Sequence, residues 1–500
     1  DENTEEADRP NILICIADDA SHMGRNCSWI HTPAFDRIAG EGILFTNAYT
    51  PNAKSAPSRS CLLTGRNSWQ LKEAANHFCN FPEEFKTYPE VLDENGYHVG
   101  YTGKGWAPGD PGTINGKPRE LVGKAWNKIK TNPPTSAISK VDYAANFKSF
   151  YQNRSGDQPF CFWYGGREPH RGYEFASSLE AGRETTDIDT VPPFFPDNEK
   201  VRIDLLDYGL EIEYFDRHIQ RILKFLEDKG ELDNTLILVT SDHGMPFPRA
   251  KSDAYYFSNH VPMAIMWQNR LKQPGRVVDD YVSFIDLAPT FLDAAGIDWD
   301  KSGMKPSPGK SLRTVFMNPD QEKPFRDFVL VGKERHDVGR PDDYGYPIRG
   351  IVKDDWLYLM NYRNDLWPAG NPQTGYTTVA GSPTKTAVLN ARHDPETKYL
   401  WELSFGKRPE EELYHLETDP YCINNLARTK AQIKAELKQT MERELKNQSD
   451  PRMFGKGEIF HSYEFTWKWV RNLYERMVIK EEDIVAPWIN ESDVEPDFNK

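Results

Sequence analysis

The stretch Asn11-Ile12-Leu13-Ile14-Cys15-Ile16-Ala17-Asp18-Asp19 decides the class of fold. A continuous apolar run with β-branched residues predicts a strand that is buried on both faces. Thr32–Ala39 then predicts a short helix, and Gly42–Tyr49 predicts a second strand. Strand, helix and strand in this order indicate an α/β fold.

Three further segments predict strands that are each followed by polar side chains. Because open α/β sheets bind ligands at the carboxyl ends of their strands, we expect these polar residues to form one site. Tyr97–Gly103 is followed by Lys104, Phe160–Tyr164 by Arg167-Glu168-Pro169-His170-Arg171, and Thr235–Thr240 by Ser241-Asp242-His243. Residues 201–229 predict a long amphipathic helix before the last of these strands.

The paired carboxylates Asp18 and Asp19 end the first predicted strand. Carboxylate oxygens are hard donors that suit Ca²⁺ or Mg²⁺. Taken alone, the pair also fits an Asx turn or a helix N-cap. The motif by itself therefore leaves a metal site and a turn as alternatives.

The stretch Ser55-Ala56-Pro57-Ser58-Arg59-Ser60-Cys61-Leu62-Leu63-Thr64-Gly65-Arg66 predicts a loop that turns into a helix. Proline is tolerated in the first helical turn, so Ser55 lies at the helix N-terminus, where free N–H groups favour an anion. Arg59 lies one turn later on the same face and can hold an anionic nucleophile or an oxyanion. A capped surface helix is the alternative interpretation.

The length of 500 residues predicts one large domain and one smaller domain. After residue 345 the pattern changes: residues 348–360 predict a hairpin, and residues 412–420 predict a further strand. We therefore expect a large α/β domain over residues 1–345 and an α+β subdomain over residues 346–500. The segment 365–395, rich in Pro, Gly and charge, predicts a long loop.

The charge and hydropathy of the chain exclude several functions. A net charge of -15 argues against nucleic acid as a partner. The mean hydropathy is -0.71 and no apolar run approaches about 20 residues, so no membrane span is expected. The acidic, polar residues 1–8 do not predict a signal peptide, although a leader removed earlier remains an alternative. An anionic substrate would require cations that are concentrated in one pocket.

The motif from Ser55 to Arg66 resembles the signature of the sulfatase family, in which Cys or Ser precedes x-P-S-R and a later T-G-R. In that family a maturating enzyme oxidises the first residue to formylglycine, whose hydrated aldehyde attacks sulfur. The resemblance implies a serine-type sulfatase with an alkaline phosphatase-like fold. It further implies a large mixed sheet between helices, a smaller subdomain with an antiparallel sheet, and a periplasmic or secreted location.

The same resemblance implies a role for each polar residue of the site. One Ca²⁺ would be bound by Asp18, Asp19, Asp242, His243 and one oxygen of the modified Ser55. Arg59 would steady the formylglycine, Lys104 and Lys251 would bind sulfate oxygens, and His170 would be the general acid. Many sulfatases have Gly-Lys-x-His where this chain has Gly103-Lys104-Gly105-Trp106, and His77 is a possible substitute for the missing histidine.

The chain resembles the heparan N-sulfatase (sulfamidase) branch most closely, through motifs such as Pro169-His170-Arg171 and Asp242-His243-Gly244-Met245-Pro246-Phe247-Pro248. The resemblance implies a sulfated saccharide as substrate, with N-sulfoglucosamine as one choice and contacts from Glu168 and Arg171 to the sugar. An O-sulfatase acting on a glycosaminoglycan or an algal polysaccharide is the alternative. A phosphodiesterase or phosphonate hydrolase of the same superfamily, and an inactive sugar-binding protein with unmodified Ser55, are the others.

Overall fold

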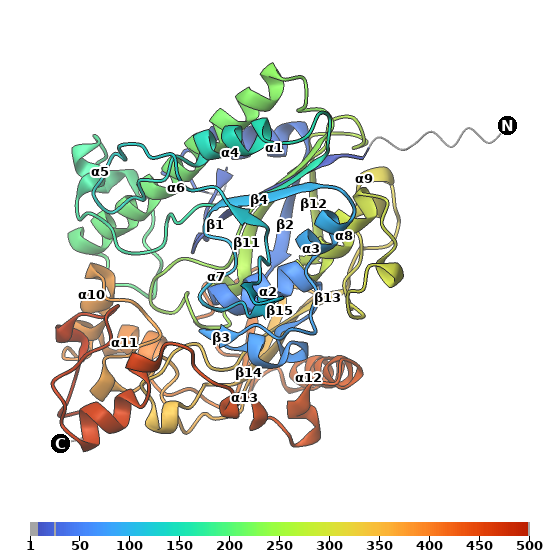
Figure 1. Ribbon diagram of the computed structural model, residues 1–500. Helices are drawn as coiled ribbons and strands as arrows, with labels where there is room; N and C mark the ends of the chain where they lie inside the picture. Colours follow the sequence, from blue (N-terminus) through green and yellow to red (C-terminus); the bar gives the residue numbers. More distant parts are fainter. Residues whose placement is uncertain (1–8, 25–26, 499–500) are drawn as a thin grey trace.

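The computed structural model describes residues 9–24 and 27–498, so the outer limits of the two predicted domains, residues 1 and 500, lie outside the described residues. A large mixed sheet runs through the molecule in the strand order β12-β2-β11-β10-β1-β9-β4-β8 (Figure 1). Its strands are β1 (Asn11–Ala17), β2 (Ile43–Tyr49), β4 (His98–Gly103), β8 (Lys124–Ala125), β9 (Phe160–Gly165), β10 (Thr235–Ser241), β11 (His260–Met266) and β12 (Arg276–Ser283). The five strands predicted from the sequence are all present, which confirms the predicted α/β class.

Strand β1 is the buried centre of this sheet. It pairs in parallel with β10 on one side and with β9 on the other, and β9 pairs in parallel with β4. In this register Ala17 lies opposite Ser241, and Gly103 lies opposite Gly165. The carboxyl ends of the four strands therefore meet at one edge, as the sequence predicted.

Helices cover both faces of the sheet. Leu13, Cys15 and Ala17 pack on one side of β1, and Ile12, Ile14 and Ile16 pack on the other, as the two-residue period of a strand requires. The first face is covered by α1 (Pro33–Glu41), α4 (Tyr143–Gln152) and α6 (Glu199–Asp228), and the second by α2 (Ser55–Thr64), α3 (Tyr88–Glu94) and α8 (Leu287–Ala294) (Figure 1). Helix α6 confirms the long amphipathic helix that the sequence predicted over residues 201–229.

A second, antiparallel sheet has the strand order β13-β14-β15-β16 and lies in the lower part of Figure 1. Its strands are β13 (Phe328–Lys333), β14 (Ile348–Lys353), β15 (Trp356–Asn361) and β16 (Glu411–His415), and the helix α12 (Ala431–Asn447) packs on it. The hairpin β14–β15 confirms the prediction for residues 348–360. Strand β13 belongs to the same sheet but precedes residue 345, so the small sheet begins earlier in the chain than the predicted boundary.

The segment 365–395 contains a helix, α10 (Pro383–Ala391), where the sequence analysis expected only a loop. The helix begins at an N-cap signal, because the Ser382 side chain accepts a hydrogen bond from the Lys385 N–H and Pro383 occupies the first turn. The remaining strands and α-helices are β3 (Cys79–Asn80), β5 (Gly109–Asp110), β6 (Thr113–Ile114), β7 (Lys117–Pro118), α5 (Ser177–Glu180), α7 (Tyr256–Asn259), α9 (Arg313–Met317), α11 (Lys398–Phe405) and α13 (Ile459–Ser462). Within the described ranges, every helix is too short or too polar to cross a membrane.

Candidate active site

Ser55 is the first residue of helix α2, which lies buried beneath the edge where the strands of the large sheet end. All ten residues of α2 are buried, so the alternative of a capped surface helix is wrong. The Ser55 hydroxyl donates to Asp18 Oδ1 at 3.1 Å and accepts from Lys104 Nζ at 3.0 Å. The residues that follow β1 and β4 therefore both lie within hydrogen-bond distance of the hydroxyl oxygen at the N-terminus of α2.

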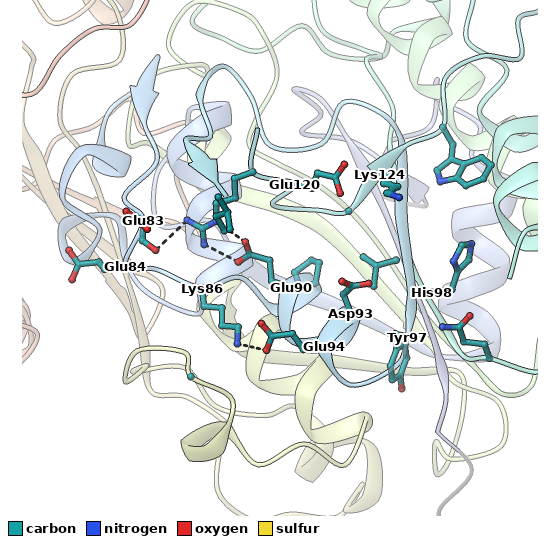
Figure 2. Close-up of a pocket in the computed structure, with 18 residues that line it drawn as sticks. Glu83, Glu84, Lys86, Glu90, Asp93, Glu94, Tyr97, His98, Glu120 and Lys124 are labelled. Carbon is teal, nitrogen blue, oxygen red and sulfur yellow. Dashed lines mark hydrogen bonds and ion pairs between the residues drawn. The ribbon is translucent and has the colours of Figure 1, made fainter. Parts of the chain in front are cut away.

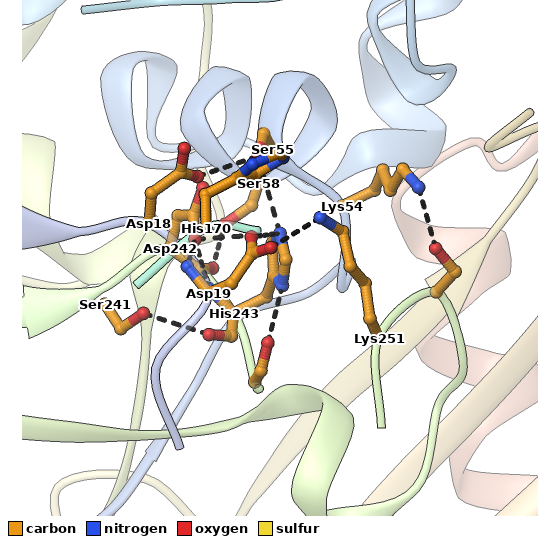
Figure 3. A network of polar contacts seen from close by, with 12 residues as sticks. Asp18, Asp19, Lys54, Ser55, Ser58, His170, Ser241, Asp242, His243 and Lys251 are labelled. Carbon is orange, nitrogen blue, oxygen red and sulfur yellow. Dashed lines mark hydrogen bonds and ion pairs between the residues drawn. The ribbon is translucent and has the colours of Figure 1, made fainter. Parts of the chain in front are cut away.

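Asp18, Asp19, Asp242 and His243 form a buried cluster next to Ser55 (Figure 3). One ligand atom from each side chain lies within 4.8 Å of the others, which is the arrangement of a metal site. The Asp19 and His243 backbone N–H groups both donate to Asp242 Oδ1, at 3.0 and 2.9 Å, and so hold the loops of β1 and β10 together. The four residues predicted as metal ligands are therefore in one place.

The atoms of this cluster fit a bound cation. His243 Nδ1 lies 3.0 Å from the Gly244 carbonyl oxygen, which can only accept, so Nδ1 bears the proton and Nε2 of the neutral ring carries a lone pair. That lone pair faces Asp19 Oδ1 at 3.0 Å, and this buried carboxylate oxygen has no hydrogen-bond partner. Two facing acceptors are costly to bury unless a cation lies between them. The donor set of three carboxylates and one imidazole can hold a divalent ion.

Three cations surround the carboxylates on the other side. Lys104 Nζ lies 2.8 Å from Asp18 Oδ2, and Lys251 Nζ lies 2.5 Å from Asp19 Oδ2. Arg59 is fully buried, and its Nε donates to Asp242 Oδ2 at 3.1 Å. The Arg59 guanidinium also donates to the carbonyl oxygens of Lys104 and Gly105, which fixes the segment after β4 against α2.

The close ion pairs outweigh the effect of burial on the aspartates. Burial alone would raise the pKa of Asp18, but the positive charge of Lys104 holds it well below its ordinary value. Burial likewise opposes the ionisation of Asp19, yet the positive charge of Lys251 keeps its pKa well below the usual range. The pKa of Lys251 is raised, because its attraction to Asp19 and Asp18 exceeds the cost of its burial. Asp18, Asp19 and Lys251 therefore stay charged at neutral pH.

A cavity of about 720 Å³ opens onto this cluster, and we call it the active-site pocket. Its walls include Asp18, Lys104 and His170, together with the aromatic side chains of Tyr101 and Trp106. His170 Nδ1 lies 2.6 Å from the Arg171 carbonyl oxygen, so its Nε2 is the atom available to a ligand. The surrounding protein and the charge of Lys251 lower the pKa of His170, and Asp19 and Asp18 oppose that shift.

Glu168 and Arg171, predicted to contact the sugar, also line the active-site pocket, but both bind to other protein groups. Glu168 is 1% exposed and accepts hydrogen bonds from the Tyr143 hydroxyl at 2.7 Å and from the Ser139 N–H at 2.9 Å. Arg171 forms a bidentate ion pair with Asp204 of α6 at 2.7 and 2.8 Å. These contacts use the polar atoms that a sugar would need, so both residues support the pocket. Their contact with sugar stays a prediction.

His77, the predicted substitute for the missing histidine, is buried and forms no hydrogen bond with Ser55. Its backbone N–H donates to the Arg335 carbonyl oxygen, and its Nδ1 has no hydrogen-bond partner. Burial, together with the positive charge of Lys54, holds the pKa of His77 well below its ordinary value, so the ring stays neutral. Its catalytic role stays a prediction.

Lys54 is a part of the site that the sequence analysis missed. It precedes Ser55, and its buried ammonium group donates to Asp337 Oδ2 at 2.6 Å and to Ser252 Oγ at 3.0 Å. This contact ties the start of α2 to the residue after Lys251 and to the region after β13. A lysine beside the signature serine was the available signal, but no local pattern pointed to Asp337.

A second cavity, of about 770 Å³, lies at the start of β4, and we call it the acidic pocket (Figure 2). Its lining includes one histidine, three cations and six carboxylates. The cations are Lys86, Arg119 and Lys124, and the carboxylates are Glu83, Glu84, Glu90, Asp93, Glu94 and Glu120. The excess of carboxylates repels an anionic ligand.

Comparisons with known proteins agree with this geometry. The family model described as Sulfatase matches residues 10–297. N-sulphoglucosamine sulphohydrolase of Homo sapiens is 27% identical over 447 residues, which cover 83% of this chain and 86% of the human protein. An ulvan-active sulfatase of Formosa agariphila is 27% identical over 437 residues, which cover 84% of this chain and 76% of that protein.

A solved structure of a protein in complex with its substrate D-glucosamine-2-N,6-O-disulfate also matches this chain. The TM-score is 0.63 at 21% identity, and the match covers 88% of this chain and 98% of that chain. At this identity the match shows a shared fold.

Proposed function

The chain belongs to the sulfatase family and has its alkaline phosphatase-like fold, and on this basis we propose that it hydrolyses sulfate from a sulfated carbohydrate. In this proposal Ser55 is oxidised to formylglycine, and Asp18, Asp19, Asp242 and His243 hold one Ca²⁺. The observation that carries the proposal is the position of the Ser55 hydroxyl, which lies within hydrogen-bond distance of both Asp18 and Lys104 beside the metal-binding cluster.

Two groups complete the site in this proposal. Ca²⁺ supplies a fixed positive charge that stabilises anionic oxygens and favours deprotonation of a neighbouring hydroxyl. An aldehyde at position 55 supplies, when hydrated, one hydroxyl as the nucleophile and a second hydroxyl that allows sulfate to leave. Serine has no second hydroxyl, so an unmodified Ser55 could not release sulfate in this way.

The side chains of the protein bind the sulfate group and move the proton. Lys104 and Lys251 bind the sulfate oxygens, where negative charge increases in the transition state. Arg59 holds the anionic oxygen at position 55. As the bond between sulfur and the sugar oxygen or nitrogen breaks, His170 protonates the leaving atom. Water supplies the remaining atoms, so the products are the free hydroxyl or amine and inorganic sulfate.

The identity of the sugar rests on the relatives. The human relative is named for N-sulphoglucosamine, which makes N-sulfoglucosamine the first substrate to test. The Formosa agariphila relative is described as ulvan-active, which supports an O-sulfated polysaccharide as the alternative. A phosphodiester or phosphonate substrate is less well supported, because the residues described contain a single cluster of potential metal ligands.

The proposal also implies a partner and a location. A sulfatase-maturating enzyme would oxidise Ser55 before the chain folds, because the residue is buried in the folded structure. A periplasmic or extracellular site of action fits a substrate that is a sulfated polysaccharide. Cell fractionation with an antibody against the chain tests the location.

Sulfate release from defined substrates tests the function. Protein co-expressed with a maturase should release sulfate from at least one sugar in a panel of N-sulfated and O-sulfated saccharides, and Ser55→Ala protein should release none. Phosphate diesters and phosphonates serve as controls in the same assay. Hydrolysis of these controls without any sulfate release would overturn the proposal.

A further inference from the structure

Two exposed cations lie on the rim of the active-site pocket and have no role in the proposed mechanism. Lys140 and Arg167 line the same cavity as Asp18, Lys104 and His170. In the described part of the chain, no carboxylate forms an ion pair with either side chain. We call Lys140 and Arg167 the rim cations.

In the described residues, the carboxyl groups of the pocket wall form no ion pair with the rim cations. Glu168 and Glu211 are both buried in this wall. Hydrogen bonds from the Ser139 N–H and the Tyr143 hydroxyl occupy both carboxylate oxygens of Glu168. Burial, with the nearby charge of Glu168, raises the pKa of Glu211 well above its ordinary value. Glu211 therefore resists ionisation, and the oxygens of Glu168 are used within the wall.

The other charges of the pocket are already paired. Asp18 is paired with Lys104, and Arg171 with Asp204 outside the cavity. The rim therefore carries two positive charges without an ion-pair partner among the described residues, in a chain whose net charge is -15. A local excess of positive charge attracts a further anionic group on a substrate that is bound in the pocket.

Hydrogen bonds hold the two rim segments in place relative to His170. The Glu168 carboxylate binds both the Ser139 N–H and the Tyr143 hydroxyl, and that hydroxyl accepts from the Arg167 N–H at 3.2 Å. The Arg167 carbonyl oxygen then accepts from the His170 N–H at 3.1 Å. One buried carboxylate thus connects the segment of Lys140 with the turn that carries Arg167 and the proposed general acid.

We propose that the rim cations bind a second anionic group of the substrate, so that the enzyme prefers sulfated saccharides with two negative groups. The second group is a carboxylate of a uronic acid or a further sulfate, since both are compact oxyanions that lysine and arginine bind. This inference rests on the proposed function, because it concerns the same pocket. It assigns specificity to the rim and leaves the chemistry to the residues around Ser55.

Paired substrates test the inference in the matured full-length enzyme. The first pair is glucosamine N-sulfate and glucosamine N,6-O-disulfate. The second pair is a uronic acid-containing N-sulfated disaccharide and its carboxyl-reduced form. We expect the wild type to prefer the member with the extra anion by about fivefold to tenfold in kcat/KM, because each exposed ion pair contributes modestly in water. The two pairs distinguish a second sulfate from a carboxylate.

Variants of the rim should remove the preference but not the activity. In the double variant Lys140→Ala/Arg167→Ala, kcat/KM for the substrate with the extra anion should fall to the value for the paired substrate that lacks this anion. For the paired substrate that lacks the extra anion, kcat/KM should stay within about twofold of the wild-type value. A rim that binds only the second anion does not contact the sulfate that is hydrolysed. The conservative variant Lys140→Arg/Arg167→Lys should keep the preference, and Lys124→Ala in the acidic pocket is the matched control.

The outcomes separate this inference from the proposed function. Sulfate release from neither member of any pair by the matured wild type would overturn the proposed function. Release with equal kcat/KM for both members would overturn the inference and leave the function standing. An equal loss of kcat/KM for both members of a pair in the double variant would also overturn the inference. Such a loss would indicate that the rim cations affect the pocket as a whole.

Discussion

The active-site pocket and the acidic pocket lie at opposite ends of strand β4 and have similar volumes, about 720 and about 770 Å³. In the active-site pocket the charges beside Ser55 are largely buried: the Lys104 and Asp18 side chains are 16% and 3% exposed. In the acidic pocket, Lys86 and Glu94 are 26% and 59% exposed. Burial makes charges act strongly on each other and on a ligand, whereas water and salt screen an exposed pair. The difference indicates that burial, more than the number of charged groups, makes one cavity a reactive site.

The largest expected difference between the two pockets concerns a matched pair of lysines. Lys104→Ala should lower kcat/KM for sulfate release by about 10²–10³-fold, because it removes a donor to the reacting group. Lys124→Ala, at the other cavity, should change it by less than about twofold, because an exposed cation contributes little. Steady-state kinetics on matured proteins, with thermal unfolding as a folding control, measure both. Equal losses in the two variants would contradict the comparison.

Metal removal should affect only the active-site pocket. Chelation should abolish sulfate release, and added Ca²⁺ should restore it. A ligand present at 100 times its dissociation constant stabilises the folded state by about 2.7 kcal/mol, so Ca²⁺ should raise the Tm. The Ca²⁺-dependent shift should vanish in Asp242→Asn and persist in Asp93→Asn of the acidic pocket. A shift that depended on Asp93 would place the ion in the wrong cavity.

The ion pairs of the two pockets should differ in their contribution to stability. Arg171→Ala should lower the free energy of unfolding by about 3–5 kcal/mol, because it leaves Asp204 buried without its partner. Lys86→Ala, which breaks an exposed pair with Glu94, should lower it by about 0–1 kcal/mol. Urea unfolding followed by tryptophan fluorescence gives both values. Similar losses in the free energy of unfolding for the two variants would show that burial does not distinguish the ion pairs of the two pockets.

The smallest expected effect concerns Glu211, which is buried in the active-site pocket with a pKa raised well above its ordinary value of 4.5. Because the folded chain resists ionising Glu211 and the unfolded chain does not, the wild type loses stability as the pH rises from about 4.5 through the folded-state pKa. Glu211→Gln lacks this loss, so its stability relative to the wild type should increase over that range. Tm measurements from about pH 4 to about pH 9 test this. A difference in Tm between Glu211→Gln and the wild type that did not change with pH would contradict a buried neutral carboxyl group at Glu211.

The sequence predicted those parts of the fold and site that depend on local patterns. An apolar run followed by polar residues marks each central strand, and the rule that parallel strands end at one edge brought Asp18, Lys104 and Asp242 together. The pairing of Lys54 with Asp337 could not be predicted, because it joins residues 283 positions apart that share no motif. The pairing of Arg171 with Asp204 was missed for the same reason. Each depends on how the helices and the smaller sheet pack against the large sheet.

Two features of the fold were not predicted for a related reason. Strand β13 has no turn that ties it to the hairpin β14–β15, so its membership of the small sheet appears only in the register of the pairing. Helix α10 begins at Ser382-Pro383, a cap signal that lies inside a segment whose composition favours a loop. In both cases tertiary packing decided between structures that the local sequence allowed.

The central claim is that residue 55, as formylglycine, acts together with the buried cations and a metal ion around it. The most direct test varies the level of maturase and measures, in the same samples, the fraction of residue 55 oxidised by mass spectrometry and the rate of sulfate release. The account predicts that the rate rises in proportion to the oxidised fraction and extrapolates to zero for unmodified serine. Sulfate release at full rate by protein in which residue 55 is entirely serine would contradict it.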